Sequence, residues 1–588
     1  MKILIIGGGI SGISAAKVAL GKRHDVTVLE SQGEPGGLMA RIANCRVGFK
    51  TFFDEIREKK GLTVINGACI EKVKRVGMGF SVGLDNGQVL DADRVIISAG
   101  LTPYDPVEYK GKRVLTSLEY DSVIDQRQGE LPSDFHKIAF FLCVGSRSKE
   151  YPLCSSVCCS YTIREIKWTL QRAKPEITVF YNDLRFFGQE FFMERAFRDS
   201  GVRFIRANSR YFDEDDDGVT VRFYAGGGIK EERFNYAVLA IGLRPNPELK
   251  KLASLFGFSL NEYGFVREDR PLTTDAEGVY VSGGALEPMN IKDSILTGFG
   301  AGFLASMDGD TRDDLISYNN IIYREEPPAF DISDSGHNIY LFYLATENPG
   351  HAYLYEYVSA RYIEAARMLK REKKDVYVVT RNMVTPSYAE IDYEQARREG
   401  VVFIHLEEEE QAFFDNSVFK ITGCGRDITI ENPRIIRLDD YIDGLKEKEF
   451  LSLYRSEPQL RWSPTKWNRK RYHIGFIRHP RDKRWEDRER LGAIGEITLN
   501  MIEERVLPQV NEERCSGCGS CKNACPHEAI EIELKQKDLA IFGPNPTTFI
   551  PIAHIREDTC AGCGLCVSTC PSDSISMEAQ EFLGLENS

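Results

Sequence analysis

Short apolar runs recur along the chain, and several of them end in a turn of small residues. Ile3–Ile6 predicts a buried strand, Ile13–Leu20 continues with helical character, and Asp25–Leu29 predicts a second strand. The same strand-and-turn pattern returns in three later segments, Val95–Gly100, Val238–Gly242 and Gly278–Gly284. Strands that alternate with helices in this way predict an α/β fold.

The first of these turns has glycines at the GxGxxG spacing, Gly7, Gly9 and Gly12, and Glu30 ends the next strand. Such glycines allow a tight turn and let backbone N–H groups approach a pyrophosphate at a helix N-terminus. An acid about twenty positions further on accepts a hydrogen bond from a ribose hydroxyl. A glycine-rich turn without a ligand is the alternative, but the strand, the helix and the acid stand in the order that a dinucleotide site requires.

A second glycine pair favours FAD over NAD as the dinucleotide. Gly36 and Gly37 follow Glu30 closely, as they do in flavoproteins with two dinucleotide sites. We expect the flavin to be bound by residues of the glycine-containing turns. The candidates are Gly7, Gly9, Ser11, Gly12, Glu30, Gly36, Gly37, Leu38, Ala99, Gly100, Gly283, Gly284 and Ile291.

The order of the strands resembles the thioredoxin-reductase-like flavoprotein fold over residues 1–310. That resemblance implies an FAD domain in two pieces, 1–136 and 271–310, with a second Rossmann-like domain inserted at 137–270. Such enzymes usually have an aspartate at the position of Gly284, so this carboxylate is missing here.

Four cysteines occupy the turn where the inserted domain of such flavoproteins carries glycines for NAD(P)H. They follow a predicted strand and precede a predicted helix, and they are Cys143, Cys154, Cys158 and Cys159. Four thiolates suffice for a [4Fe–4S] cluster, and a helix N-terminus favours thiolate and cluster anions. Two alternatives stay open, namely four buried cysteines without a metal and a redox disulfide. Because Gly145 alone remains of the glycine pattern, NAD(P)H is not expected to bind there.

The C-terminal region carries the pattern Cys-x-x-Cys-x-x-Cys-x-x-x-Cys-Pro twice, as bacterial two-cluster ferredoxins do. The fourth cysteine of each run reaches the other cluster in such domains. The predicted ligand sets are therefore Cys515, Cys518, Cys521 and Cys570 for one cluster and Cys560, Cys563, Cys566 and Cys525 for the other. Zinc is the alternative metal, but four-cysteine zinc sites use two separated pairs. We expect an α+β ferredoxin domain over residues 506–588.

The cysteine turn also carries a resemblance to one family. Its residues Cys143-Val-Gly-Ser-Arg147 and Cys154-Ser-Ser-Val-Cys158-Cys159-Ser-Tyr161 resemble the A subunit of heterodisulfide reductase. They are also similar to flavoprotein subunits of the quinone-interacting oxidoreductase of sulfate reducers. The resemblance implies FAD, a cluster ligated by the four cysteines, and a role in passing electrons between partner subunits.

The same resemblance implies one residue near the flavin. In that family the flavin can split electron pairs, and a lysine five residues after the second adjacent cysteine lies beside it. Arg164 stands at that position here, and a guanidinium exchanges a proton less readily than an ammonium. Arg164 is thus the candidate catalytic residue, and a solvated helix position is the alternative interpretation.

A second α/β unit follows an acidic, proline-containing linker at 311–335. Glu176–Asn182 matches Asp375–Arg381, so the two copies are offset by 375 − 176 = 199 residues. At this offset the four cysteine positions become Phe342, Tyr353, Tyr357 and Val358. We therefore predict that 336–505 is a degenerate Rossmann-like copy that serves as a scaffold or docks partners.

The charge and composition of the chain exclude several other classes of protein. A net charge of −13 over 588 residues disfavours nucleic-acid binding, and the Arg-rich stretch 461–490 is better explained as a solvated or docking surface. No run of about eighteen apolar residues occurs, so no membrane span is expected. The 15 cysteines cluster at tight spacings in a long chain, which favours metal ligation over disulfides. We expect a cytoplasmic location.

These features predict an FAD and iron–sulfur protein, with three [4Fe–4S] clusters, that forms part of a hetero-oligomeric redox complex. It would relay electrons, with or without bifurcation or confurcation, between partners such as the B and C components of heterodisulfide reductase. Hydrogenase- or dehydrogenase-type proteins and a membrane quinone-reactive protein are other partners of this kind. One alternative is a stand-alone NAD(P)H:acceptor flavin oxidoreductase, and the other is a structural hub whose flavin is redox-inert.

Overall fold

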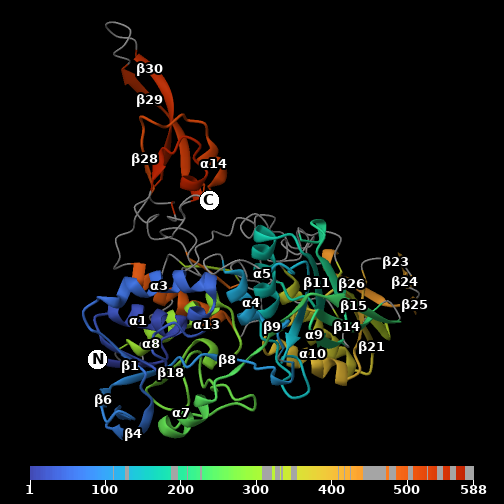
Figure 1. The fold of residues 1–588 in the computed structure, drawn as a ribbon, viewed down its shortest axis with the longest axis horizontal. Coiled ribbons are helices and arrows are strands. Elements are labelled where there is room, and N and C mark those ends of the chain that lie inside the picture. The colour runs from blue at the N-terminus through green and yellow to red at the C-terminus, as the bar shows by residue number, and fades with distance from the viewer. Residues whose placement is uncertain are drawn as a thin grey trace.

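Figure 1 shows the fold of the chain in a computed structural model. The structure describes residues 1–588 apart from 110, 126–131, 187–196, 208–209, 226–227, 308–320, 325–331, 333–335, 346–353, 408–409, 416, 424–425, 441–471, 476–484, 501–507, 526–527, 539–546, 557–559, 561–564 and 577–588. The predictions for Tyr353 and Cys563, and most of those for 311–335 and 461–490, lie outside the described residues.

The first sheet contains five parallel strands in the order β18-β7-β1-β2-β3. Its strands are β1 (Lys2–Ile6), β2 (Asp25–Glu30), β3 (Leu62–Asn66), β7 (Arg94–Ile97) and β18 (Val279–Val281). Helices lie against it because strands buried on both faces need cover from above and below. They are α1 (Ile10–Gly21), α3 (Ala43–Arg57) and α8 (Ile291–Ala305). An antiparallel sheet of β4 (Ile70–Val76), β5 (Gly79–Leu84) and β6 (Val89–Ala92) follows β3.

The second sheet is also parallel, in the order β12-β11-β10-β16-β9. Its strands are β9 (Val114–Thr116), β10 (Lys137–Val144), β11 (Glu176–Tyr181), β12 (Arg203–Arg206) and β16 (Tyr236–Ile241). Two helices, α4 (Ser117–Ile124) and α5 (Cys158–Arg172), pack on it. An antiparallel sheet of β13 (Arg210–Asp215), β14 (Gly218–Ala225) and β15 (Gly228–Phe234) completes this unit.

Two observations lead us to propose a junction between these two units that lies before the predicted boundaries 137 and 270. Strand β9 already belongs to the second sheet, and the buried residues of α7 (Glu248–Phe256) already join the core of the first. The chain crosses over in an antiparallel pair of β8 (Leu101–Pro103) and β17 (Leu243–Pro245). We therefore propose this pair as the boundary; three-residue strands are too short for hydrophobic periodicity to identify.

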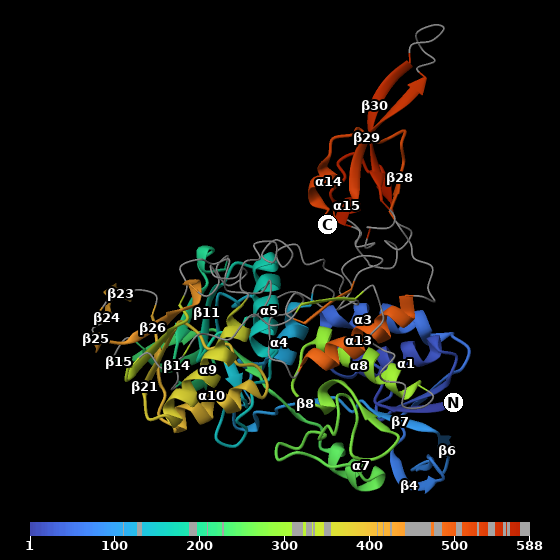
Figure 2. The ribbon, with the colours of Figure 1, turned by 180° about the vertical axis from the view of Figure 1, so that it is seen from behind.

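The third sheet has the order β22-β21-β20-β26, which repeats the order β12-β11-β10-β16 of the second. Its strands are β20 (Ile339–Tyr343), β21 (Asp375–Thr380), β22 (Val402–His405) and β26 (Arg434–Arg437). The antiparallel trio also recurs, as β23 (Gln411–Asp415), β24 (Val418–Gly423) and β25 (Arg426–Glu431). The helices are α9 (Tyr355–Arg371) and α10 (Ala389–Arg398). Helix α9 packs against β21 and against α10, and Figures 1 and 2 draw both helices in yellow.

The copy is predicted to end at residue 505, and we propose that it ends before residue 486 instead. Helix α13 (Glu486–Asn500) packs against α8 of the first unit rather than against the third sheet. Gly492 and Gly495 allow this contact, because a Cβ on them would lie 2.5 Å from Leu296 Cδ1 and 2.4 Å from the Phe299 carbonyl oxygen. Within the predicted linker, β19 (Ile321–Arg324) pairs in parallel with β27 (Tyr472–Gly475).

The C-terminal region forms two small antiparallel sheets with two short helices, drawn in red in Figure 1. The elements are β28 (Gln509–Val510), α14 (Ser520–Ala524), β29 (Ile530–Asp538), β30 (Thr547–Ile555), α15 (Leu565–Ser568) and β31 (Ile575–Ser576). No helix in the described part of the chain is long and apolar enough to cross a bilayer. The thioredoxin-reductase-like arrangement of two sheet units and the α+β C-terminal domain confirm the predicted fold class.

Candidate functional site

The glycine turn between β1 and α1 is closely packed on one side and open on the other. Gly7 has φ +110°, and a Cβ there would lie 2.2 Å from the Ser98 carbonyl oxygen. A Cβ at Gly12 would lie 2.0 Å from the Gly7 carbonyl oxygen. Gly9, at the N-terminus of α1, has ordinary extended backbone, and a Cβ there would meet none of the described atoms within 4 Å. The open side is where a pyrophosphate would approach the backbone.

Two further predicted segments close around this turn. The Gly36 N–H donates to the Gly8 carbonyl at 2.9 Å, and a Cβ at Gly37 would lie 3.5 Å from Gly9 Cα. Glu30 is buried, and its carboxylate accepts from the backbone N–H groups of Gly8 and Gln32, each at 2.9 Å. The Ser31 hydroxyl also donates to Oε1 at 3.4 Å, whereas Oε2, which accepts from Gly8, keeps a lone pair for a ribose hydroxyl. The arrangement thus fits an adenine dinucleotide, and the individual contacts stay predictions.

A chain of serine hydroxyls connects the two ends of the split unit. Ser282 Oγ lies 2.7 Å from Ser11 Oγ and 2.8 Å from Ser98 Oγ. A Cβ at Gly283 would lie 2.6 Å from Ser11 Cβ, so glycine is needed there. Ser98 and Ser282 were absent from the predicted site, because isolated serines beside small-residue turns have no distinguishing spacing. The other candidates, Leu38 on α2 (Gly37–Arg41), Ala99, Gly100, Gly284 and Ile291, all lie in turns or at helix starts of this unit.

The four cysteines of the second unit come together at the end of β10 and the start of α5. Cys143 has φ +62° and lies within a register shift in β10, and Cys158 and Cys159 are the first residues of α5. Cys154 forms an isolated bridge with Ser387. All four are buried free thiols. A left-handed backbone at a non-glycine residue costs about 1–3 kcal/mol and persists where surrounding structure enforces it.

The thiols contact one another in this structure. A hydrogen bond to Cys158 and then burial raise the pKa of Cys143 well above its ordinary value. For Cys158 the bond with Cys143 lowers the pKa, but the bond with Cys159 and burial outweigh it and raise the value. Among the described residues, no group of three or more His, Cys, Asp or Glu side chains surrounds a common metal position.

A buried arginine beside these thiols suits an anionic group. Arg147 binds Asp183 at 2.7 Å and Glu390 at 2.9 Å, yet its Nη1 has no hydrogen-bond partner among the described residues. Burial lowers the pKa of Arg147, but Glu390, Asp183 and the thiols of Cys143 and Cys154 outweigh it and hold the guanidinium charged. Four thiols, a helix N-terminus and an orphaned guanidinium N–H therefore fit a [4Fe–4S] cluster.

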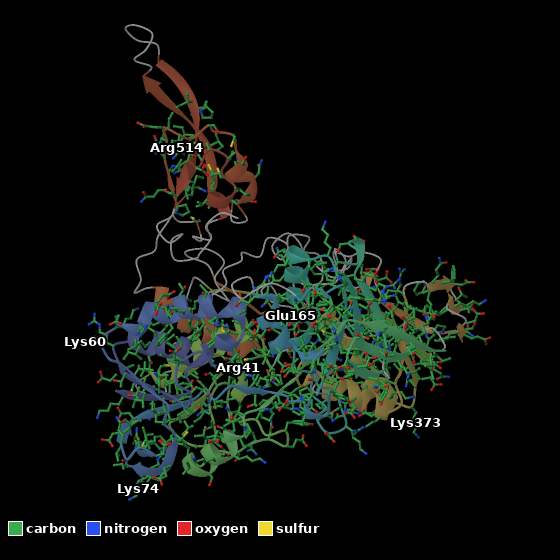
Figure 3. All side chains as sticks on the ribbon, in the orientation of Figure 1. Arg41, Lys60, Lys74, Glu165, Lys373 and Arg514 are labelled. Atoms are coloured by element: carbon green, nitrogen blue, oxygen red, sulfur yellow. The ribbon has the colours of Figure 1, made fainter. Side chains whose placement is uncertain are left out.

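Helix α5 also holds an acid that sequence analysis missed. Arg164, the predicted flavin neighbour, is exposed on α5, which agrees with the alternative interpretation of that residue. Its neighbour Glu165 is 1 % exposed and lies on α5 within the body of the protein (Figure 3), and neither carboxylate oxygen has a partner in the part of the chain that the structure describes. Burial, followed by the charge of Asp121, raises its pKa well above 4.5. The polar spacing Thr162, Glu165, Thr169 within an otherwise apolar face was the signal available in the sequence.

In the C-terminal region five of the described cysteines lie in one small core, whereas Cys518 is exposed. Cys521 and Cys566 are buried, with Cys515, Cys525 and Cys570 packed against them. Three sulfurs accept backbone N–H groups, as thiolate ligands do: Cys515 from Ala553 at 3.5 Å, Cys525 from Ala529 at 3.3 Å and Cys570 from Ser574 at 3.3 Å.

Cys570 is the fourth cysteine of the second run, and it lies with the first run. Burial is the largest cause that raises the pKa of Cys521. The negative charges of the Cys515 and Cys570 thiolates raise it further. Burial raises the pKa of Cys570 itself, but bonds from the Ser574 and Ser572 hydroxyls outweigh it and lower the value to about 7. These contacts support the predicted ligand sets, in which the fourth cysteine of each run binds the cluster of the other run. The ligand sets stay a prediction.

We expect Gly9→Ala to fold normally and to lose the flavin, because the added methyl would fill the open side of the turn without touching the described residues. Flavin absorbance per chain, with circular dichroism and melting temperature as checks on folding, measures this. Gly33→Ala is the matched control, since a Cβ there also meets none of the described atoms within 4 Å. A flavin content equal to wild type in Gly9→Ala would contradict the site.

We expect Glu165→Gln to stabilise the chain increasingly as the pH rises. Because the folded-state pKa lies above 4.5, the wild-type carboxyl folds without penalty below that pH and loses stability above it, by at most about 1.4 kcal/mol per pH unit. Glutamine removes this loss. Unfolding midpoints at pH 5.5, 7 and 8.5 test the trend. Glu364→Gln, the exposed equivalent 199 residues later, should show no such pH dependence.

Comparisons with known proteins find family matches in the first sheet unit and in the C-terminal region. Residues 1–120 match the pyridine nucleotide-disulphide oxidoreductase family, and residues 514–574 match the 4Fe-4S dicluster domain. Among solved structures, thioredoxin reductase of Lactococcus lactis shares 19% identity over 52% of this chain and 97% of its own, with a TM-score of 0.40. The NAD-dependent persulfide reductase of A. fulgidus shares 20% identity over 49% and 53%, with a TM-score of 0.34.

Curated relatives carry one family name. The A subunit of the H(2):CoB-CoM heterodisulfide,ferredoxin reductase of Methanothermobacter thermautotrophicus is 32% identical over 37% of each chain. The iron-sulfur A subunit of the CoB--CoM heterodisulfide reductase of Methanocaldococcus jannaschii is 31% identical over 33% of each. A protein of Archaeoglobus profundus that is named as similar to the heterodisulfide reductase A subunit is 26% identical over 47% of this chain and 46% of its own. The matches thus span a third to a half of these relatives, and over those parts the chain is similar to the A subunits of heterodisulfide reductases.

Proposed function

We propose that the chain is an electron-transfer component of a multi-subunit redox complex, with FAD in the first sheet unit and a third cluster at Cys143–Cys159. The observation that carries this proposal is the position of the four buried cysteines, which replace the nucleotide turn of the second unit. Relatives named as subunits of heterodisulfide reductases support the partner relationship.

The bound groups would supply two-electron chemistry at the flavin and one-electron transfer at the clusters. The protein residues bind and orient them. The Gly7–Gly12 turn presents backbone N–H groups, and the start of α5 offers a positive helix terminus to the cluster. Arg147 contributes a fixed positive charge in a site without water-exposed thiols.

A stand-alone NAD(P)H reductase is disfavoured by the packing at the nucleotide turn. The Tyr104 ring lies against Gly145, where a Cβ would come within 2.3 Å of it. Arg244 stacks over the Tyr104 and Tyr151 rings at 5.0 and 4.2 Å. These aromatic side chains occupy the approach that a nicotinamide dinucleotide pyrophosphate would need.

We expect Cys158→Ala to retain FAD and to lose about four of about twelve irons per chain, because one of three cubane clusters loses a ligand. Iron and flavin analysis of the anaerobically purified chain measures this. Cys45→Ala, a buried cysteine outside both cysteine sets, is the matched control and should keep all the iron. Wild-type protein with only about eight irons would overturn the third cluster.

We expect NADH or NADPH alone to leave the flavin spectrum of the purified chain unchanged, whereas chemical reduction of the clusters should bleach it. Anaerobic titration followed by visible absorbance measures both. Rapid bleaching by NADH would support the stand-alone reductase instead, and a flavin that stays oxidised beside reduced clusters would support an inert hub. Mass spectrometry of co-purifying proteins identifies the partners.

A further inference from the structure

The two α/β copies contact each other through equivalent loops. The Leu184 N–H donates to Asn382 Oδ1 at 3.0 Å, and the Met383 N–H donates to Asp183 Oδ1 at 3.3 Å. These are the same contact made twice, because 382 − 183 = 199 and 383 − 184 = 199, the offset of the repeat. Reciprocal contacts of this kind define an isologous two-fold interface.

A second pair of contacts follows the same rule. His405 Nε2 lies 2.9 Å from Asp183 Oδ1, and Arg206 Nη2 donates to Asn382 Oδ1 at 3.3 Å. Arg206 and His405 are again 405 − 206 = 199 residues apart. The second copy therefore sits on the first as one protomer of a two-fold dimer sits on its partner, but within one chain.

This internal dimer covers the cysteine turn of the first copy. The segment Asn382–Glu390 supplies Ser387, which bridges Cys154, and Glu390, which binds Arg147 at 2.9 Å. Glu390 also pairs with Arg185, whose Nη1 donates to the Thr385 carbonyl at 2.8 Å. Both carboxylate oxygens of Glu390 are thus committed to buried arginines.

The second copy has lost the chemistry of the first. The positions that match Cys143, Cys158 and Cys159 are filled by Phe342, Tyr357 and Val358, each at most 1 % exposed in an apolar core. The first copy therefore holds the thiols. The second copy has an apolar core at the equivalent positions and contributes Glu390, which pairs with arginines of the first copy.

We propose that the second copy is a built-in dimer partner whose segment Asn382–Glu390 seals the Cys143–Cys159 turn and, through Glu390, fixes Arg147 as a countercharge that raises the reduction potential of the cluster. The redox part rests on the third cluster of the proposed function. A buried positive charge stabilises the more negative, reduced cluster, and the exclusion of water leaves that charge weakly screened.

Opposite charge changes should move the cluster potential in opposite directions. Arg147→Gln should shift the midpoint potential of this cluster to a more negative value, and Glu390→Gln should shift it to a more positive one. Redox-titrated electron paramagnetic resonance of the full chain measures both. Glu399→Gln, which breaks an ion pair with Arg367 at the far end of α10, is the control and should leave the potential unchanged. Potentials that do not move, or that move the same way in both variants, overturn the countercharge.

The seal has its own measurement, which does not need a cluster. Glu390→Ala removes contacts to both buried arginines and should increase amide hydrogen exchange in peptides that contain Leu153–Cys158, relative to Glu399→Ala. Unchanged exchange overturns the seal. If Cys158→Ala keeps all the iron, the proposed third cluster is wrong, and the proposed effect of Arg147 on its potential is wrong as well. Hydrogen exchange still tests whether Asn382–Glu390 seals the cysteine turn. If Cys158→Ala loses iron and neither potential nor exchange responds, the present inference fails alone.

Discussion

The buried ion-pair network around Asp183 holds the two α/β copies together, and the cysteine turn depends on it. Asp183 is 3 % exposed and receives Arg147, Arg206 and His405 as well as the Met383 N–H. Burial opposes its charge, but His405, Arg147 and Arg185 outweigh that cost and hold the pKa of Asp183 well below its ordinary value. A buried ion pair adds little net stability when complete, but removal of one partner costs about 3–5 kcal/mol. The network therefore acts chiefly to specify one arrangement of the copies.

The same network explains why the cysteine turn can be both strained and stable. Cys143 has a left-handed backbone, and Gly145 and Gly242 leave no room for a side chain beside Tyr104 and Ser146. Strained backbone persists where surrounding contacts determine it. Here some of the surrounding contacts, those of Ser387 with Cys154 and of Glu390 with Arg147, come from a segment more than two hundred residues further along the chain.

The sequence predicted those parts of the molecule whose physics is local. Fixed glycine and cysteine spacings indicated the Gly7–Gly12 turn and the C-terminal domain, and a constant offset of 199 residues indicated the repeat. Contacts that depend on tertiary packing could not be predicted in this way. Short β9 carries no periodicity, and Glu165 resembles any helix glutamate until the fold shows both of its oxygens without partners among the described residues. The contact of α13 with α8 depends on Gly492, because a side chain there would collide with Leu296. The sequence alone does not show that these two helices meet.

The covalent connection between the two copies has a consequence for association. A cover supplied by a separate chain would leave at low protein concentration, since its occupancy follows mass action. A tethered copy faces its partner at an effective concentration that does not fall when the protein is diluted. The two-fold surface of the first copy is also already occupied, so it cannot recruit a second chain to form a symmetric pair or an open filament.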